Sequence, residues 1–246
     1  RNHRDFLPML EALSVDAEWI LTDLRGRGYS AYDPSPQNYT PQTYVDDIVQ
    51  LLDYLGKKTV DIVGTSLGGI MAMMLNVQHP ERVGSVVLND IGAYISRNAV
   101  TNIGDYLRIA QLHDNWDSVV TAIKPIYSEF FTNLTQTQWY ALAHRLYRQK
   151  ENGKLAPDYD PALFADDNYS GDTTTDIDLW PFFNSLNNKP TLVIRGANSG
   201  LLTPQLLAKM HTSHAGLQSA TIPDRGHAPF LDEPAAVAAL QQFLST

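Results

Sequence analysis

The stretch TVDIVGTSLGGIMAMMLNVQH, residues 59–79, decides the fold predicted for this chain. Its first part, Thr59–Val63, is an apolar run of strand length, and Gly68–His79 is rich in small and apolar residues that favour a helix. Between them lies GTSLGG, Gly64–Gly69, which contains the pattern G-x-S-x-G. A strand that turns sharply into a helix through this pattern is a nucleophile elbow, and it exposes Ser66 at the carboxyl end of the strand.

A serine in such a turn lies beside a natural anion site. The first N–H groups of a helix have no partner within the helix, so we expect the N–H of Leu67 to stabilise a negatively charged oxygen. Other interpretations of the stretch are a plain Gly-rich turn and a phosphate-binding loop. The chain lacks G-x-x-x-x-G-K-[ST], which excludes the phosphate loop, and the flanking strand and helix favour the elbow over a plain turn.

A serine nucleophile needs a neighbouring base, and His227 is the best candidate among the seven histidines. It stands in PDRGHAPFLDEP, between the last predicted strand, Ser219–Ile222, and the last predicted helix, Pro234–Leu244. This order places it on a loop at the same edge of the sheet as Ser66. The other histidines fit this role less well, and none shows metal-ligand spacing such as H-E-x-x-H. They are His3, His79, His113, His144, His211 and His214.

Strands and helices alternate along most of the chain. Apolar runs predict further strands at Asp16–Leu24, Val83–Leu88 and Thr191–Arg195. This alternation indicates an α/β protein with a mostly parallel sheet that is flanked by helices. In residues 92–180 the strand signals vanish and aromatic-rich helical segments appear. We therefore expect a helical cap in residues 92–180, inserted into a core formed by residues 1–91 and 181–246.

A cap of this kind would cover Ser66, so its ring-bearing side chains are candidates for lining a substrate pocket. The candidates are Tyr94, Tyr106, Trp116, Phe130, Trp139, Tyr140 and His144. An aromatic stripe at helical spacing is more often part of a core than of a binding site. The predicted substrate-binding residues are Tyr94, Trp139, Tyr140 and His144, assigned as a group.

Five stretches together resemble the α/β-hydrolase superfamily, in its branch of small cap-bearing esterases and C–C hydrolases. They are DLRGRGYS (Asp23–Ser30), GTSLGG (Gly64–Gly69), VVLNDIG (Val86–Gly92), PTLVIRGANS (Pro190–Ser199) and GHAPFL (Gly226–Leu231). The resemblance implies the fold and a serine nucleophile, and it leaves the substrate open. It also implies that Arg25 ties loops together, although Arg25 could instead pair with a substrate carboxylate.

The resemblance further implies an acid that orients His227, usually in the loop after the strand Thr191–Arg195. That loop holds Asn198, Ser199 and Gly200, none of which is a carboxylate. One explanation is that Asp90, just past the strand Val83–Leu88, serves as the acid. The alternative is that Gly200 replaces a native acid.

The resemblance also implies that a turn supplying the second oxyanion donor precedes Arg1. We therefore expect residues before Arg1, carrying strands that belong to the sheet, and we expect Arg1 and Asn2 to lie near that donor. The second donor itself cannot be assigned from the sequence.

Composition excludes several classes of function. The 246 residues carry 27 acidic and 18 basic side chains and a formal charge of -9, which disfavours nucleic acid and anionic membranes as partners. There is no cysteine, so disulfides and thiolate metal sites are excluded, and a reducing cytoplasm is the expected location. The sequence does not indicate an oligomeric state.

These observations predict a serine hydrolase that cleaves a small carboxylic ester through an acyl-enzyme, with no metal or organic cofactor. One alternative uses the same residues to cleave a C–C bond in a vinylogous diketone. Another is a non-catalytic ligand-binding protein on the same fold, because Gly200 occupies the usual position of the acid.

Overall fold

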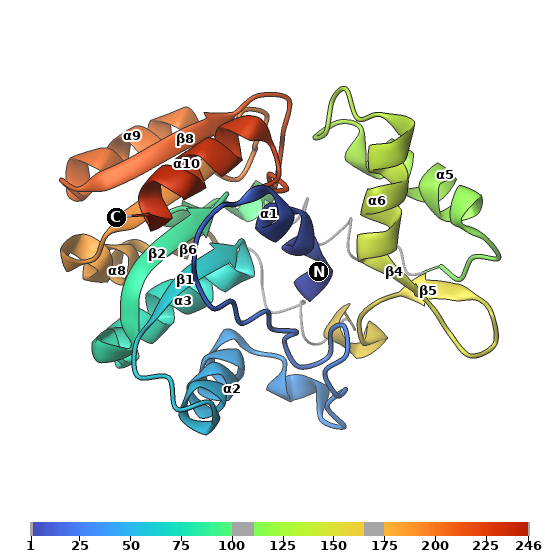
Figure 1. The fold of residues 1–246 in the computed structure, drawn as a ribbon, viewed down its shortest axis with the longest axis horizontal. Helices are drawn as coiled ribbons and strands as arrows, with labels where there is room; N and C mark the ends of the chain where they lie inside the picture. Colours follow the sequence, from blue (N-terminus) through green and yellow to red (C-terminus); the bar gives the residue numbers. More distant parts are fainter. Residues whose placement is uncertain (1, 100–110, 165–174, 246) are drawn as a thin grey trace.

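The centre of the molecule is a four-stranded parallel sheet (Figure 1). The computed structural model describes residues 2–99, 111–164 and 175–245. The sheet has the order β1-β2-β7-β8, so its two middle strands come from distant parts of the chain. The bounds are β1 Val60–Thr65, β2 Val83–Asn89, β7 Thr191–Gly196 and β8 Leu217–Ile222. All three pairings are parallel, which confirms the predicted mostly parallel sheet.

Helices cover both faces of this sheet because the strands alternate their apolar side chains between two cores. Val86, Leu88 and Val193 join one core, whereas their neighbours Val87 and Leu192 join the other. The first core also takes side chains from α2, α3, α8 and α9, and the second takes them from α1 and α10. The bounds are α1 Leu7–Ala12, α2 Pro41–Tyr54, α3 Leu67–Gln78, α8 Trp180–Asn184, α9 Pro204–Ser213 and α10 Pro234–Leu244.

Residues 111–164 form a separate hydrophobic cluster that lies to one side of the sheet (Figure 1). Its elements are α5 Trp116–Tyr127, α6 Gln136–Leu146 and the antiparallel pair β4 Tyr147–Gln149 and β5 Leu155–Pro157. Before and after this region, β3 (Tyr94–Ile95) pairs antiparallel with β6 (Ile177–Asp178). A short antiparallel ladder therefore joins the described residues on either side of this cluster.

Short 3-10 turns connect several of these elements. They are η1 His3–Asp5, η2 Pro36–Asn38, η3 Pro80–Arg82, η4 Pro161–Phe164 and η5 Ser185–Asn188. Within the three described ranges, no helix combines the length and apolarity that crossing a membrane requires.

The predicted strand at Asp16–Leu24 is wrong: residues 13–24 form no regular element in the structure. A strand requires a neighbour with which to exchange backbone hydrogen bonds. Ile20 and Leu21 instead line a cavity of about 820 Å³, which is also lined by Val60 and Ile62 of β1, the strand at the edge of the sheet. The apolar pattern of this segment is thus present without a partner strand in the described part of the chain.

Helix α3 offers a matched test of the core. Met73 is 0% exposed, whereas Val77 on the same helix is 48% exposed. We expect Met73→Ala to lower the free energy of unfolding by about 2–5 kcal/mol, because the truncation leaves a cavity. Val77→Ala should change it by less than about 0.5 kcal/mol. Urea unfolding of both variants measures the difference, and similar losses would contradict the described packing of α3.

Candidate active site

Ser66 occupies a strained turn between β1 and α3. Its backbone has φ 53° and ψ -113°, a conformation that few residues other than glycine adopt. A Cβ atom added at Gly64 would lie 2.5 Å from the carbonyl carbon of Gly68, so only glycine fits at that position. This geometry presents the side chain of Ser66 to the cavity at the carboxyl edge of the sheet.

The second glycine of the pattern, Gly68, is not required by close packing. A Cβ added at Gly68 would meet no heavy atom within 4 Å, whereas one added at Gly69 would lie 2.4 Å from Cγ2 of Ile91. The close approach of α3 to the sheet therefore depends on Gly64 and Gly69. The sequence pattern alone would have assigned this constraint to Gly68.

His227 lies beside Ser66 although 161 positions separate them in the chain. The distance from His227 Nε2 to Ser66 Oγ is 2.9 Å. Its loop is fixed by Glu233, whose carboxylate accepts hydrogen bonds from the backbone N–H groups of Phe230 and Leu231 and pairs with Arg225. Glu233, which precedes α10, thus holds the histidine loop.

The carboxylate of Asp90 contacts the other nitrogen of the imidazole, at 2.9 Å from Oδ2 to His227 Nδ1. Asp90 is fully buried at the end of β2 and has a positive φ of 55°. Its Oδ1 accepts a hydrogen bond of 2.8 Å from the N–H of Gly196, and its Oδ2 accepts one of 2.6 Å from Ser199 Oγ. The structure therefore brings Ser66, His227 and Asp90 into one chain of contacts.

Ser199 is a residue that the sequence interpretation missed. It stands in the loop after β7, where an acid was sought, and it donates to Asp90 while its oxygen accepts from the N–H groups of Leu201 and Leu202. Its neighbour Gly200 has open space where a Cβ would lie. Ser199 follows β7, the strand next to β2 in the sheet, and this strand order, which the sequence does not give, brings it to Asp90.

Leu67 is the first residue of α3 and lines the same cavity as Ser66. The leading N–H groups of a helix have no acceptor within it, so Leu67 is placed as an oxyanion donor would need to be. Asn2 also lines the cavity, but its side-chain N–H groups bind the carbonyl of Arg145 and the carboxylate of Asp158. Arg1 lies outside the described residues.

Apolar side chains from several elements line the cavity around Ser66 and His227. They include Tyr127, Phe130, Phe164, Leu201 and Phe230. Phe130 had been proposed as a pocket residue, and it packs on the histidine loop, since a Cβ at Gly226 would lie 2.6 Å from its Cβ.

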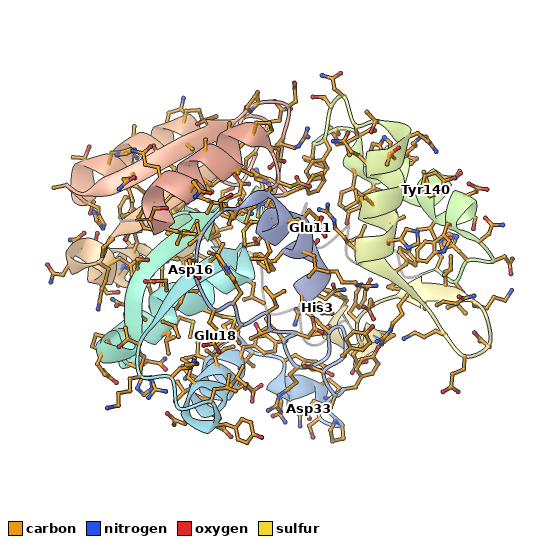
Figure 2. All side chains as sticks on the ribbon, in the orientation of Figure 1. His3, Glu11, Asp16, Glu18, Asp33 and Tyr140 are labelled. Atoms are coloured by element: carbon orange, nitrogen blue, oxygen red, sulfur yellow. The ribbon has the colours of Figure 1, made fainter. Side chains whose placement is uncertain are left out.

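The four predicted substrate-binding residues are not among the residues that line this cavity. Trp139 is buried inside the cluster of residues 111–164, and Tyr140 donates a hydrogen bond to Asp117 on α5. Figure 2 shows Tyr140 on the side of α6 that faces away from the sheet. His144 stacks on Trp116, with ring centroids 3.6 Å apart, and Tyr94 belongs to the β3–β6 ladder.

These positions explain why periodicity misled the pocket prediction. An aromatic stripe on α5 and α6 holds the two helices together, and it does so away from Ser66. Desolvation lowers the pKa of the His144 imidazole, and the positive charge of the nearby Arg4 lowers it further. The remaining candidate, Tyr106, lies outside the described residues.

Two other charged side chains have structural partners. Arg25 pairs with Asp33 and with Asp47. The hydrogen bond to Asp47 contributes most to raising the pKa of its guanidinium, and the hydrogen bond to Asp33 also contributes. Asp224 accepts a hydrogen bond from Thr132. In the part of the chain that the structure describes, no cluster of three or more His, Asp or Glu side chains could hold a metal ion.

Comparisons with known proteins bear on the fold. The sequence profile described as "alpha/beta hydrolase fold" matches residues 2–234. A 3-hydroxybutyrate-oligomer hydrolase of Cupriavidus necator is 32% identical over 251 residues, which cover 100% of this chain and 85% of the relative. An esterase of Mycobacterium tuberculosis is 25% identical over 223 residues, 89% of this chain and 71% of the relative.

A solved structure is also similar over the whole chain. The crystal structure of an alpha/beta hydrolase from Novosphingobium aromaticivorans has a TM-score of 0.92 and 34% sequence identity, and the match covers 100% of this chain and 86% of that one. The similarity in fold therefore extends over the whole length of this chain.

The two glycines of the elbow allow a direct test of its geometry. Gly64→Ala should lower the free energy of unfolding by about 1–3 kcal/mol, because its Cβ would collide with backbone atoms of α3. Gly68→Ala has room for its methyl group and should be neutral or stabilising by up to about 1 kcal/mol, because alanine favours a helix. Urea unfolding measures both, and equal losses would contradict the described turn.

Proposed function

The chain belongs to the α/β-hydrolase family, and from this premise we propose that it cleaves a small carboxylic ester through an acyl-enzyme. The observation that carries the proposal is the continuous chain of contacts from Ser66 Oγ through the imidazole of His227 to the buried carboxylate of Asp90. Hydrolysis is the activity named for its relatives. The ester substrate and the roles of individual residues are our inference from the geometry.

In the first half of the reaction, Ser66 Oγ attacks the ester carbonyl carbon. His227 Nε2 accepts the hydroxyl proton, and Asp90 accepts a hydrogen bond from Nδ1–H, which fixes the tautomer and stabilises the imidazolium. The negative charge that develops on the carbonyl oxygen is stabilised by the N–H of Leu67. When the intermediate collapses, the C–O bond to the alcohol breaks, and the alcohol leaves with the proton from His227.

In the second half, water replaces the alcohol. His227 removes a proton from water, whose oxygen attacks the acyl carbon. Collapse of this intermediate returns the proton to Ser66 and releases the carboxylic acid. The apolar lining from Phe130, Phe230 and Leu201 limits water near the site and suits the apolar part of an acyl group.

A role in ligand binding alone is less consistent with the geometry. Gly200 occupies the position where the family's acid usually stands, which was the reason to consider that role. Asp90 provides the carboxylate from the neighbouring strand, in contact with His227. The proposed triad is therefore complete without an acid at Gly200.

Ser66→Ala should abolish ester turnover, with kcat reduced by at least about 10³-fold, because no hydroxyl remains to attack the carbonyl. Hydrolysis of 4-nitrophenyl esters measures kcat. A fluorophosphonate should phosphonylate Ser66 of the unmodified protein with loss of fluoride, and peptide mass spectrometry locates the adduct.

The labelling also separates the remaining interpretations. Failure of Ser66 to label would favour ligand binding without catalysis. Labelling without ester turnover, together with cleavage of a vinylogous diketone, would replace the ester proposal with C–C hydrolysis.

Asp90→Asn should lower kcat by about 10³- to 10⁴-fold, because an amide that donates to Nδ1 holds the wrong tautomer of His227. Ser199→Ala removes one hydrogen bond from Asp90 and keeps its carboxylate, so we expect a loss on the order of tenfold. Steady-state kinetics of both variants measure kcat and show which substitution lowers it more. A near-normal rate for Asp90→Asn would show that another group orients the imidazole.

A further inference from the structure

Arg27 lines the cavity that holds Ser66 and His227. Arg27 is 9% exposed, so its positive charge is almost removed from bulk water. A buried charge is unfavourable unless an opposite charge or several hydrogen bonds compensate it. The partners of Arg27 therefore decide whether its charge is structural or available to a ligand.

The described part of the chain provides Arg27 with little compensation. Of the five N–H donors of its guanidinium, one is paired with another side chain, at 3.0 Å from Nη1 to the hydroxyl of Tyr44. The guanidinium also lies 5.3 Å from the centroid of the Tyr44 ring. Among the described residues no carboxylate forms an ion pair with Arg27, whereas Arg25, two positions earlier, pairs with Asp33 and Asp47.

The acidic side chains on the neighbouring segment are engaged elsewhere. Asp158 pairs with Arg4 and Arg148, and Asp160 accepts hydrogen bonds from Tyr39 and from the N–H of Ala162. The carboxylates of both aspartates therefore have partners other than Arg27. The backbone of this segment lies close to the Arg27 loop, because the N–H of Gly28 binds the carbonyl of Asp158.

The other cation in the cavity wall is also paired. Lys57 Nζ lies 2.5 Å from a carboxylate oxygen of Glu18. Two basic residues, Arg27 and Lys57, are among the described residues that line the cavity, and of these two Arg27 has no carboxylate partner. None of the Arg27 nitrogens is both fully buried and without a partner, so its unpaired N–H groups keep some exposure to solvent. Arg27 itself is part of the cavity wall.

The backbone around Arg27 is held rigidly. Gly26 and Gly28 have φ of 77° and 56°, and a Cβ on either would collide with Tyr39 or Asp23, respectively. The N–H of Arg27 binds the carbonyl of Leu24. Because these contacts fix the loop and Tyr44 fixes the guanidinium, the side chain is pre-organised before a ligand binds.

We propose that Arg27 binds a carboxylate group of the substrate, so that the preferred ester carries a free carboxylate in addition to the ester that Ser66 attacks. The flat guanidinium matches the two oxygens of a carboxylate. A local cation is needed because the protein carries a formal charge of -9 and repels anions at long range. This inference rests on the proposed ester hydrolysis and specifies its substrate class.

The test compares half-esters of dicarboxylic acids with their neutral counterparts. A series of 4-nitrophenyl half-esters from glutarate to suberate is paired with the same compounds methylated at the free carboxylate, and released 4-nitrophenol is measured. The unmodified protein should prefer the acid of the best-fitting pair by about 10- to 100-fold in kcat/KM. In Arg27→Gln this ratio should fall towards one, mainly through KM, and Arg27→Lys should keep part of it.

Lys57→Gln is the matched control, because it also removes one positive charge from the cavity wall but that charge is already paired with Glu18. It should keep the preference for the acid. A second readout is the melting temperature: the free dicarboxylate should raise it in the unmodified protein and in Ser66→Ala, and should fail to do so in Arg27→Gln.

The outcomes distinguish the two proposals. If the dicarboxylate binds through Arg27 but no ester is cleaved, the ester proposal fails and the carboxylate site stands. If the unmodified protein cleaves the methylated ester as well as the acid, the carboxylate site is overturned and ester hydrolysis stands. This comparison in the unmodified protein decides the question even if Arg27→Gln does not fold.

Discussion

The buried carboxylate of Asp90 is the interaction on which the arrangement of the site depends. It has no exposure to solvent, so its oxygens require partners from the protein. One oxygen binds the N–H of Gly196 at the end of β7, and the other binds Ser199 and His227. A single charge at the end of β2 therefore fixes the positions of the β7 loop and of the histidine loop, and through His227 it reaches Ser66. The steric match at Gly196, where a Cβ would lie 2.4 Å from the carbonyl oxygen of Gly226, allows the two loops to approach this closely.

Much of this arrangement could be predicted from the sequence because parallel strands bring their carboxyl ends to one edge. The pattern around Ser66 and the place of His227 after the last strand were enough to predict that the two meet. Asp90 was one of two explanations for the missing acid, and its contact with His227 is seen only in the structure. Ser199 could not be assigned, since a serine in a loop has no distinctive signal until its neighbour is known. The predicted strand at Asp16–Leu24 was wrong because an apolar pattern specifies a buried face and cannot supply a pairing partner.

The cavity wall could not be predicted for a different reason. Trp139 and Tyr140 have the helical spacing of a lining surface, yet they hold α5 and α6 together, because the same spacing describes a helix that packs on another helix. Arg25 and Arg27 stand two positions apart in one loop and cannot be ranked by composition. Coordinates separate them, since one has two carboxylate partners and the other has a tyrosine hydroxyl.

The short ladder between β3 and β6 has a consequence for how such a protein can diversify. Tyr94–Ile95 and Ile177–Asp178 hold both ends of the inserted region together. Further contacts, among them the bridge between Arg27 and Tyr159 and the ion pair between Arg145 and Asp232, attach the region to the core. The entropy of closing a loop grows slowly with its length, by about 0.6 kcal/mol for each doubling. The chain beyond the ladder can therefore change in length at little cost in loop-closure entropy, while the ladder keeps its two ends at the same place beside the sheet.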